Sequence, residues 1–229
     1  MVQDYQQAFT KFLISERALQ FGLFELKSGR LSPYFFNSSL FNNGKSVELL
    51  GSFYASAIEK HLPDCTSIYG PAYKGIPLCL STAIALSRTN QKDIGYFFNR
   101  KEKKVHGDKG WLLGKKPHST DTIALVDDVI TNGQTKVDAV ERLETECNAR
   151  VNAVFVAFDR MEQNSEGADA KFAFEQRTGI PVHAIVNIRE ILNILKASLS
   201  TDSPLSDYST LADVEHYLGE YGVTERLEL

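Results

Sequence analysis

The fold of this chain is decided by one stretch of sequence, Ile123-Ala124-Leu125-Val126-Asp127-Asp128-Val129-Ile130-Thr131-Asn132-Gly133-Gln134-Thr135. Its apolar start, Ile123 to Val126, predicts a buried strand, and a helical pattern follows from about Gln134 to Cys147. In an open α/β sheet, ligands bind beyond the carboxyl ends of the strands. A helix that begins there offers N–H groups to a phosphate. The stretch therefore predicts an α/β fold with an anion site at this strand end.

Two adjacent carboxylates, Asp127 and Asp128, end the predicted strand. Carboxylates repel phosphate, so they suit a ligand that also carries hydroxyls, as a ribose does. Acids at a strand end also cap helices, so the pair alone leaves a capping role open. Thr131 to Thr135 add hydroxyls, an amide and the flexible Gly133, which favour a sugar-phosphate site. The stretch has neither the G-x-G-x-x-G of a Rossmann fold nor the G-K-[ST] of a Walker A loop.

Strands and helices alternate through the middle of the chain, which predicts a mainly parallel sheet covered on both faces. The predicted strands are Thr66 to Tyr69, Ile94 to Phe98, Ile123 to Val126, Val151 to Phe158 and Val182 to Ile185. The predicted helices are residues 3–20, Ser46 to Leu62 with Ser46 as the cap, Ile76 to Ser87, Gln134 to Cys147 and Ile188 to Leu199. Phe21 to Phe36 reads as short strands and turns. Residues 99–121 read as a long loop, which in a compact domain is commonly a functional lid or disordered. Residues 162–171 and 200–210 read as solvated connections.

Composition is that of an ordinary globular protein. The 229 residues are 43% hydrophobic and 24% charged, and the net charge of −4 argues against a protein that mainly wraps nucleic acid. The three cysteines form no C-x-x-C pair, which favours thiols in a reducing compartment over disulfides or zinc. No signal pattern and no apolar run of about 18 residues is present. A cytoplasmic protein is expected.

Two further groups could bind anions. Gly70-Pro71-Ala72-Tyr73-Lys74-Gly75 follows a predicted strand and places a lysine between two glycines, although a simple Gly-Pro turn is the plain alternative. A basic run opens the long loop and contains Arg100, Lys101, Lys103, Lys104 and His106. Such a run is usually a solvated face. Here the run follows a strand, and this position favours a mobile cationic lid that covers a departing anion.

Two groups could bind an organic acid. The aromatic segment around Phe35 and Phe36 is either core or an apolar wall for a planar ring. Arg160 follows the strand Val151 to Phe158, where it forms a surface ion pair with Asp159 or grips a carboxylate.

Taken together, these stretches resemble the orotate phosphoribosyltransferases of the type I phosphoribosyltransferase fold. Residues 126–133 are similar to the phosphoribosyl pyrophosphate (PRPP) signature of that superfamily. Residues 26–30, 32–36, 70–75 and 98–102 are similar to the orotate-using branch, in order and at compatible separations. The resemblance covers about residues 5 to 195.

The resemblance implies transfer of a phosphoribosyl group from PRPP to orotate. The products are orotidine 5′-monophosphate and pyrophosphate, in the synthesis of UMP, with Mg²⁺ held mainly by PRPP and waters rather than by a protein metal site. It implies residues 1–45 as an N-terminal helix and orotate-binding hood, 46–199 as a core with a lid at about 100–121, and 200–229 as a C-terminal extension. It also implies a homodimer in which lid residues complete the partner's site, and a cis peptide just before Tyr73.

The site residues follow from the matched motifs. The catalytic group is Asp127, Asp128, Lys104 and His106. The PRPP group is Lys27, Tyr73, Lys74, Arg100, Lys101, Lys104, His106, Asp127, Asp128, Val129, Ile130, Thr131, Asn132, Gly133, Gln134 and Thr135. The orotate group is Lys27, Phe35, Phe36, Thr131 and Arg160. Asn132 and Gln134 depart from the family's usual Thr-Ala-Gly-Thr turn.

Two alternatives remain open at this point. A purine-type phosphoribosyltransferase shares the signature, but a neutral purine does not need Arg160 for a carboxylate. A non-catalytic PRPP-sensing regulator would keep the signature, lose Lys104 and His106, and carry a DNA-binding domain for which this chain has no room.

Overall fold

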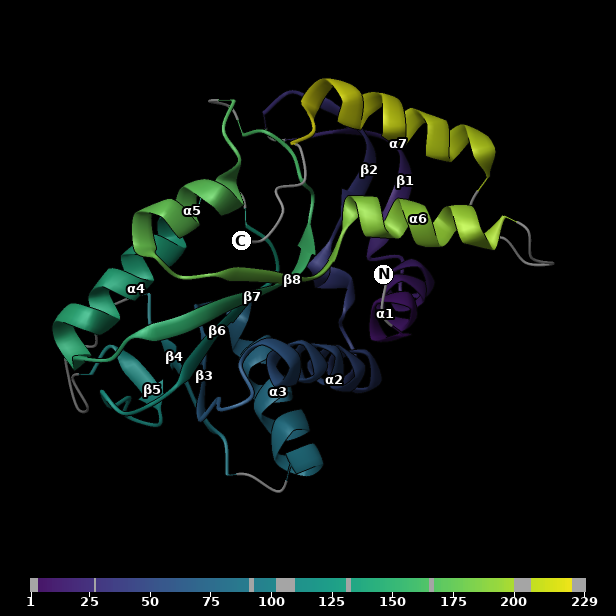
Figure 1. Ribbon diagram of the computed structural model, residues 1–229. Helices are drawn as coiled ribbons and strands as arrows, with labels where there is room; N and C mark the ends of the chain where they lie inside the picture. The colour runs from purple at the N-terminus through teal and green to yellow at the C-terminus, as the bar shows by residue number, and fades with distance from the viewer. Residues whose placement is uncertain are drawn as a thin grey trace. The chain divides into compact units, whose positions relative to one another are not determined.

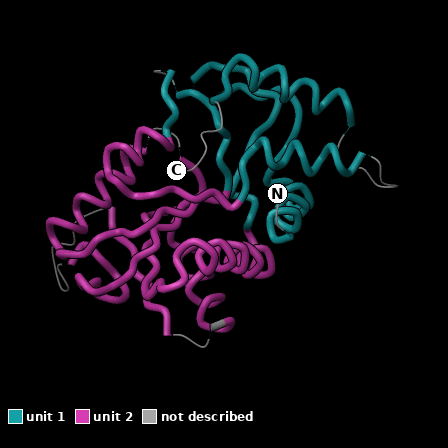
Figure 2. Tube along the Cα trace, in the orientation of Figure 1, with its two compact units in different colours: residues 1–41, 158–170, 186–229 teal, residues 42–157, 171–185 magenta. Residues whose placement is uncertain are grey.

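The decisive stretch forms a buried strand, β6 (Ile123–Asp127), and a helix, α4 (Gln134–Cys147), in the computed structural model of the chain (Figure 1). The structure describes residues 4–26, 28–90, 93–101, 110–130, 133–164, 167–199 and 207–223. These fall into two compact units, shown in Figure 2. Unit 1 is residues 1–41, 158–170 and 186–229, and unit 2 is residues 42–157 and 171–185. The functional division expected at residues 45 and 199 stays a prediction.

Unit 2 is built on a six-stranded sheet of order β5-β4-β3-β6-β7-β8. The other strands are β3 (Ser67–Gly70), β4 (Gly95–Asn99), β5 (Leu112–Gly114), β7 (Val151–Asp159) and β8 (Val182–Asn187). β3 pairs in parallel with β4 and β6, β6 pairs in parallel with β7, and β5 is antiparallel to β4. The predicted mainly parallel sheet is therefore confirmed.

Helices cover both faces of this sheet because its central strands are apolar on both sides. In Figure 1, α4 and α5 (Ala170–Thr178) lie on one side, and α2 (Gly44–His61) and α3 (Gly75–Asn90) lie on the other. Buried side chains of α4 and α5 pack on strand residues in one core cluster. Its large members include Tyr69, Phe97, Ile123, Leu125, Val137, Val140, Leu143, Val154, Val156 and Phe174.

The strand order places the ligand-binding edge. From β3 the chain moves outward to β4, and from β6 it moves the opposite way to β7 and β8. The order therefore reverses between β3 and β6, and ligands in open α/β sheets bind at such a switch point, beyond the carboxyl ends of the strands. The two strands that meet there are those that lead into the Gly70 turn and the acid pair.

Unit 1 contains a two-stranded antiparallel sheet of β1 (Leu19–Glu25) and β2 (Leu31–Phe36), in which Leu19 pairs with Phe36. Its helices are α1 (Asp4–Ser15), α6 (Ile188–Ser198) and α7 (Tyr208–Tyr221), with a short 3₁₀ turn, η1 (Ser38–Leu40). α6 begins with a reciprocal cap between Asn187 and Glu190. The apolar stripes of α6 and α7 are buried.

Several boundaries expected from the sequence are wrong. The first helix ends at Ser15 rather than residue 20, because Arg17 adopts a left-handed backbone (φ 55°) and turns the chain into β1. Asn43, not Ser46, caps α2; the Ser46 hydroxyl is the third-residue partner in a capping box.

Defined structure occurs in or next to each segment that was expected to be irregular, and most of residues 172–178 and 211–221 had received no reading from the sequence. Residues 112–114 of the expected loop form β5, whose Leu113 pairs with Phe98 on β4. Residues 170–178 form α5, and residues 208–221 form α7. Glu162, in a segment expected to be solvated, has a side chain only 8% exposed. The carboxylate is buried because charged and hydroxyl groups from distant parts of unit 1 surround it.

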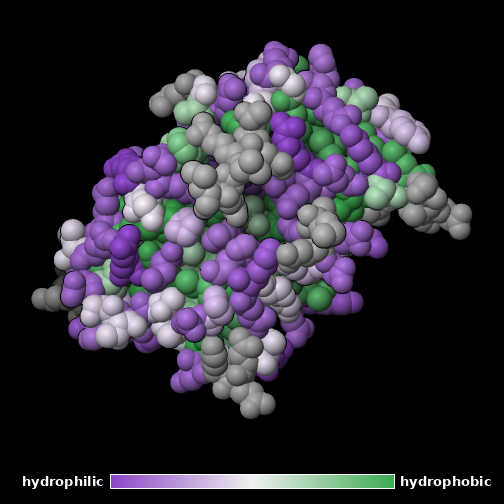
Figure 3. All heavy atoms as spheres, viewed as in Figure 1, coloured by the Kyte–Doolittle hydropathy of each residue, from purple (hydrophilic) through white to green (hydrophobic). Residues whose placement is uncertain are grey.

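The visible surface is mainly hydrophilic, with hydrophobic residues showing in patches (Figure 3). Among the described residues, no helix is both long and apolar enough to span a membrane. Cys65 and Cys79 are buried thiols, as expected from the sequence, and Cys147 is partly buried.

Candidate active site

The turn after β3 is shaped by two glycines that touch each other. A Cβ on Gly70 would lie 2.2 Å from the Gly75 carbonyl oxygen, and one on Gly75 would lie 2.8 Å from the Gly70 carbonyl carbon. No side chain fits at either position without moving backbone. The peptide between Ala72 and Tyr73 is cis, as the resemblance implied. The turn leaves Tyr73 largely exposed and directs Lys74 toward β6.

Asn99, at the end of the neighbouring strand β4, holds this turn. Its Oδ1 accepts a hydrogen bond from the Ala72 N–H at 2.9 Å and from the Tyr69 hydroxyl at 3.1 Å. An amide oxygen that satisfies a turn N–H in this way fixes the backbone on which Tyr73 and Lys74 stand.

Each aspartate of the acid pair is bound by a lysine. Lys74 Nζ lies 2.6 Å from Asp128 Oδ2, and Lys136 Nζ lies 2.6 Å from Asp127 Oδ2. The lysines differ in exposure, since the Lys74 side chain is 59% exposed and the Lys136 side chain is 8% exposed. Lys136 also donates to the Val129 carbonyl at 2.8 Å, which ties α4 to the residue that follows the acid pair. Lys74 is therefore open to solvent, and Lys136 is buried.

Tyr54 of α2 supports the pair from beneath. Its hydroxyl donates to the Asp127 carbonyl oxygen at 2.6 Å. Burial, with smaller contributions from Asp128 and Asp127, raises the pKa of Tyr54 well above its usual value. The hydroxyl therefore stays protonated and keeps its role as a donor.

α4 begins at Gln134, six residues after the acid pair. Gly133 caps it in the left-handed region (φ 71°), and its carbonyl accepts the N–H groups of Lys136 and Val137. The Gln134 amide faces along the helix surface, where it donates to Asp138 at 2.6 Å and accepts from Arg177 of α5 at 3.0 Å. Thr135 is exposed beside it. The first turn therefore offers backbone N–H groups, while Gln134 is occupied by neighbouring side chains.

The described part of the basic run lies against the Gly70 turn. The Arg100 N–H donates to the Trp111 carbonyl at 2.8 Å, which closes the strand pair β4–β5. Lys101 Nζ lies 4.6 Å from the centre of the Tyr73 ring, within reach of a cation–π contact. Both basic residues are thus associated with the edge of the sheet that carries Lys74.

Unit 1 holds Arg160, the residue predicted to grip a carboxylate. Its NH2 donates to Ser32 Oγ at 2.9 Å and to Glu162 Oε1 at 2.7 Å, and its guanidinium carbon lies 4.3 Å from the Tyr34 ring centre. Burial alone would lower the pKa of Arg160, but Tyr34 and Glu162 outweigh it and raise the pKa. The guanidinium is therefore charged and fixed.

Phe35 and Phe36 are successive residues of β2 and so point to opposite faces of the strand. Phe35 is 36% exposed and stacks on Phe24, with ring centres 5.5 Å apart. Phe36 is partly buried and packs on Phe158 at 5.4 Å. Of the two rings, Phe35 is the one that a ligand could reach as part of a wall.

The remaining predicted site residues divide by whether the structure describes them. Val129 and Ile130 continue from the acid pair as partly buried residues. The residues that lie outside the described ranges are Lys27, Lys104, His106, Thr131 and Asn132.

Four residues at these positions received no role from sequence: Tyr54, Asn99, Lys136 and Glu162. Lys136 did leave a signal, because it lies four and seven residues before Val140 and Leu143 and so carries a charge on the apolar stripe of α4. The other three depend on contacts between segments far apart in sequence, which periodicity does not report.

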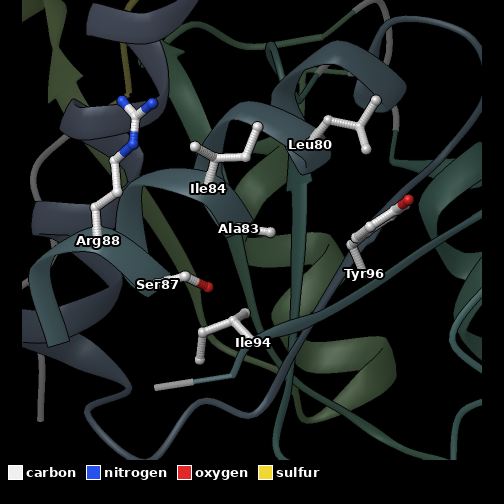
Figure 4. Close-up of a pocket in the computed structure, with 7 residues that line it drawn as sticks. All are labelled: Leu80, Ala83, Ile84, Ser87, Arg88, Ile94 and Tyr96. Carbon is white, nitrogen blue, oxygen red and sulfur yellow. The ribbon is translucent and has the colours of Figure 1, made fainter. Parts of the chain in front are cut away.

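Two observations bear on metals and cavities. Among the described residues, no group of three or more His, Cys, Asp or Glu could hold a metal ion. A groove of about 470 Å³ lies between α3 and the start of β4 and contains none of the predicted site residues (Figure 4). It is lined by Leu80, Ala83, Ile84, Ser87, Arg88, Ile94 and Tyr96.

Comparisons with known proteins agree with this geometry. The chain is 41% identical over 230 residues to the orotate phosphoribosyltransferase of Bifidobacterium longum strain DJO10A, covering 97% of this chain and all of that protein. It is 42% identical over 221 residues to that of Methylococcus capsulatus, covering 96% of this chain and 99% of the relative. The crystal structure of the Francisella tularensis orotate phosphoribosyltransferase superposes with a TM-score of 0.81 at 32% identity, over 94% of this chain and 99% of that one. No protein-family model matches the chain.

The mainly parallel sheet with a reversed strand order, together with the solved structure that superposes on it, places the chain in the type I phosphoribosyltransferase fold class. The relatives named above are about 40% identical over nearly the whole chain, which is enough to assign one family within that fold class. The chain belongs to the orotate phosphoribosyltransferase family, and it is a pentosyltransferase enzyme.

Proposed function

We propose that this chain transfers the 5-phosphoribosyl group of PRPP to orotate, giving orotidine 5′-monophosphate and pyrophosphate for UMP synthesis. The observation that carries the proposal is the 2.6 Å contact between Lys74 and Asp128 across the switch point of the sheet. It sets a cation suited to a departing pyrophosphate beside a carboxylate suited to ribose hydroxyls. Relatives about 40% identical over their whole length favour orotate over a purine as the acceptor.

The reaction breaks the bond between the anomeric carbon and pyrophosphate and forms one from that carbon to a ring nitrogen of orotate. Positive charge builds on the ribose and negative charge on the leaving group. Asp127 and Asp128 favour the first, and Lys74, Arg100, Lys101, Lys104 and His106 favour the second. Preorganised charges of this kind commonly contribute about 10²–10³-fold each. No covalent nucleophile is needed.

The 5′-phosphate is assigned to the turn before α4. Free N–H groups at the start of a helix and its partial positive charge bind phosphate without side-chain help. By the resemblance, residues 129–135, including Thr131 and Asn132, are assigned to phosphate binding, and Gly133 has the left-handed backbone that precedes α4. Because Gln134 already bonds Asp138 and Arg177, its contribution is to hold the helix start rather than to contact phosphate.

Orotate is assigned to Lys27, Phe35, Phe36, Thr131 and Arg160. A charged guanidinium fixed by Ser32 and Glu162 suits the orotate carboxylate. An exposed aromatic ring such as Phe35 suits a planar heterocycle. A neutral purine offers no carboxylate to match Arg160.

Mg²⁺ is assigned to oxygens of PRPP and to water rather than to a protein cage. Both carboxylates of the acid pair already bind lysines, which fits a pair that meets ribose hydroxyls. When bound, the ion neutralises charge on the pyrophosphate. The protein residues bind, orient and screen PRPP around it.

A homodimer with shared sites completes the proposal. The outer side of α3 supports it, because Ile84 and Tyr96 are exposed apolar side chains beside the groove of Figure 4. Glu48 and Arg88 form an exposed ion pair at 2.8 Å next to them. A two-fold interface brings a patch against itself, and a patch with both charges is self-complementary. We expect the Ile84→Glu variant to be monomeric by light scattering. The Leu23→Glu variant, with its change in unit 1, is the control and should stay dimeric. A dimeric Ile84→Glu variant would show that the interface lies elsewhere.

The test of the reaction is spectrophotometric. Loss of orotate absorbance on addition of PRPP and Mg²⁺ supports the proposal. Turnover of adenine or hypoxanthine without consumption of orotate would overturn it. The proposed cytoplasmic location rests on the reduced, buried cysteines and is tested by fractionation of the source cells.

A further inference from the structure

Glu162 is the centre of a buried polar cluster in unit 1. Its Oε1 accepts hydrogen bonds from the Tyr34 hydroxyl and from Arg160 NH2 at 2.7 Å. Its Oε2 accepts from the Tyr217 hydroxyl at 2.9 Å, and Arg30 NH1 lies 3.5 Å away. A buried carboxylate with partners on both oxygens has little freedom to rotate.

The cluster joins segments far apart in sequence. Tyr34 is on β2, Glu162 follows β7, and Tyr217 is on α7. The end of α7 is also hydrogen-bonded to the strand-like segment beside Glu162. The Gln163 N–H donates to the Tyr221 carbonyl at 2.9 Å, and the Val223 N–H donates to the Met161 carbonyl at 2.8 Å. The C-terminal helix is thus a fixed part of this cluster.

The protonation states suit a rigid hydrogen-bond network. Burial raises the pKa of Tyr34 well above its usual value and raises that of Tyr217 as well. Both phenols therefore keep the protons that they donate to Glu162.

Arg160 is the residue that this cluster immobilises. Glu162 and Ser32 hold the same nitrogen, NH2, and the Tyr34 ring lies against the guanidinium plane. Among the hydrogen bonds of the described residues, those of the Arg160 guanidinium are made by NH2, so Nε and NH1 remain available as donors to a ligand. Preorganisation of a charged donor increases affinity because less rotamer entropy is lost on binding.

We propose that Glu162 and Tyr217 are positioning residues for orotate, and that the C-terminal helix α7 is part of the device that holds Arg160 for the orotate carboxylate. This inference rests on the proposed function, in which Arg160 binds that carboxylate. Glu162 and Tyr217 act through Arg160 and do not contact the substrate.

The test compares conservative variants. Glu162→Gln should raise KM for orotate by about tenfold, because one charge-assisted hydrogen bond to Arg160 is lost. Tyr217→Phe should raise it less, and both should leave KM for PRPP close to that of the unaltered protein. Tyr208→Phe is the matched control, since it makes the same change at an exposed position of the same helix. That control should change neither KM.

A second measurement tests whether the effect passes through Arg160. Tyr217→Phe should lose most of its effect on KM for orotate when it is added to Arg160→Lys, because residues that act as one unit are not additive. Preference for orotate over uracil, which lacks the carboxylate, should fall in Glu162→Gln. Additive effects, or an unchanged preference, would overturn the proposal.

The outcomes separate this inference from the proposed function. If the unaltered protein does not consume orotate, the proposed function fails. If it does, and Arg160→Lys raises KM for orotate while Glu162→Gln and Tyr217→Phe do not, only the positioning roles fail. Equal rises in KM for both substrates with a lowered thermal midpoint would show a general structural role and would also overturn them.

Discussion

Asp127 and Asp128 are adjacent in sequence but differ in the partners that neutralise them. Asp128 binds the exposed Lys74, and Asp127 binds the buried Lys136. Under the proposed function, we expect Lys74 to leave Asp128 for the leaving group when PRPP binds, since its side chain reaches solvent. Lys136 cannot, because it is enclosed and also bonded to the Val129 carbonyl. We therefore expect Asp128 to exchange its lysine for the ribose hydroxyls, while Asp127 keeps Lys136 and acts on the ribose through its charge alone.

Lysine-to-methionine variants test this difference. Lys74→Met should lower kcat by about 10²–10³-fold, because a cation that acts on the leaving group is lost. It should lower the free energy of unfolding less than Lys136→Met does, because the Lys74 side chain is 59% exposed and an ion pair made by an exposed lysine is weak. Lys136→Met should lower the free energy of unfolding by about 3–5 kcal/mol, because it strands the Asp127 carboxylate. Urea unfolding and steady-state kinetics measure both. Lys45→Met, at an exposed helix position, is the control; equal destabilisation by the two site variants would contradict the assignment.

Cys79 predicts how stability depends on alkaline pH. Burial raises the pKa of its thiol from 9.0 to about 12. Between these values the unfolded chain has lost the proton and the folded chain keeps it, so raising the pH favours unfolding. Each pH unit above 9 should cost roughly 1.4 kcal/mol at this group. Below pH 9 its contribution is constant.

The measurement is the urea midpoint at pH 8 and at about pH 10.5. The Cys79→Ala variant should start from a lower midpoint, because it leaves a small cavity. It should then lose less stability than the unaltered protein between the two pH values. Parallel losses in the two proteins would assign the alkaline transition to other groups, such as the buried Tyr54.

At the scale of elements, the turn between β3 and α3 is the most constrained piece of the site. Gly70→Ala should destabilise the fold by about 1–3 kcal/mol, because its Cβ would meet backbone atoms of Gly75 that cannot rotate away. The loss of kcat, expressed as a free energy, should exceed the loss of unfolding free energy, because Lys74 moves with the turn. Thermal unfolding and kinetics measure the two effects.

Gly44→Ala supplies the control for that variant. Gly44 is the first residue of α2, and a Cβ there meets nothing within 4 Å. Alanine should therefore be neutral or stabilising by up to about 1 kcal/mol. A Gly70→Ala variant as stable as Gly44→Ala would mean that the turn relaxes without cost.

The elements also separate what sequence patterns can predict from what they cannot. β6, α4 and β7 follow strong apolar patterns and lie within a residue of their predicted bounds. β5 has three residues and depends on pairing with β4, so its sequence carries too little signal. α5 has a weak amphipathic pattern and is specified by the packing of residues such as Phe174 on the core.

At the scale of the whole molecule, the proposed homodimer with shared sites predicts that two inactive variants complement each other in a heterodimer. Lys104 belongs to the lid and Asp128 to the core of the site. If the lid serves the partner, a heterodimer of Lys104→Ala and Asp128→Asn subunits has one site with both defects and one site with neither. Its activity should be about half that of the unaltered dimer.

Mixed subunits with different affinity tags allow the heterodimer to be purified and its orotate consumption measured. Each variant homodimer alone should be nearly inactive, which sets the baseline. A purified heterodimer at that baseline would show that each subunit supplies its own lid.

The sequence by itself determined the α/β alternation, the acid pair, the glycine turn and the family of the enzyme. These are local properties: an apolar period, a short motif, a residue with special backbone freedom. Only the tertiary structure decided three features. These are the lysine partners of Asp127 and Asp128, the hydrogen bond by which Asn99 holds the turn after β3, and the cluster in which α7 meets Glu162. Each of these joins residues tens to more than a hundred positions apart or buries a charge. Such pairings are set by how strands and helices pack, which no local pattern records.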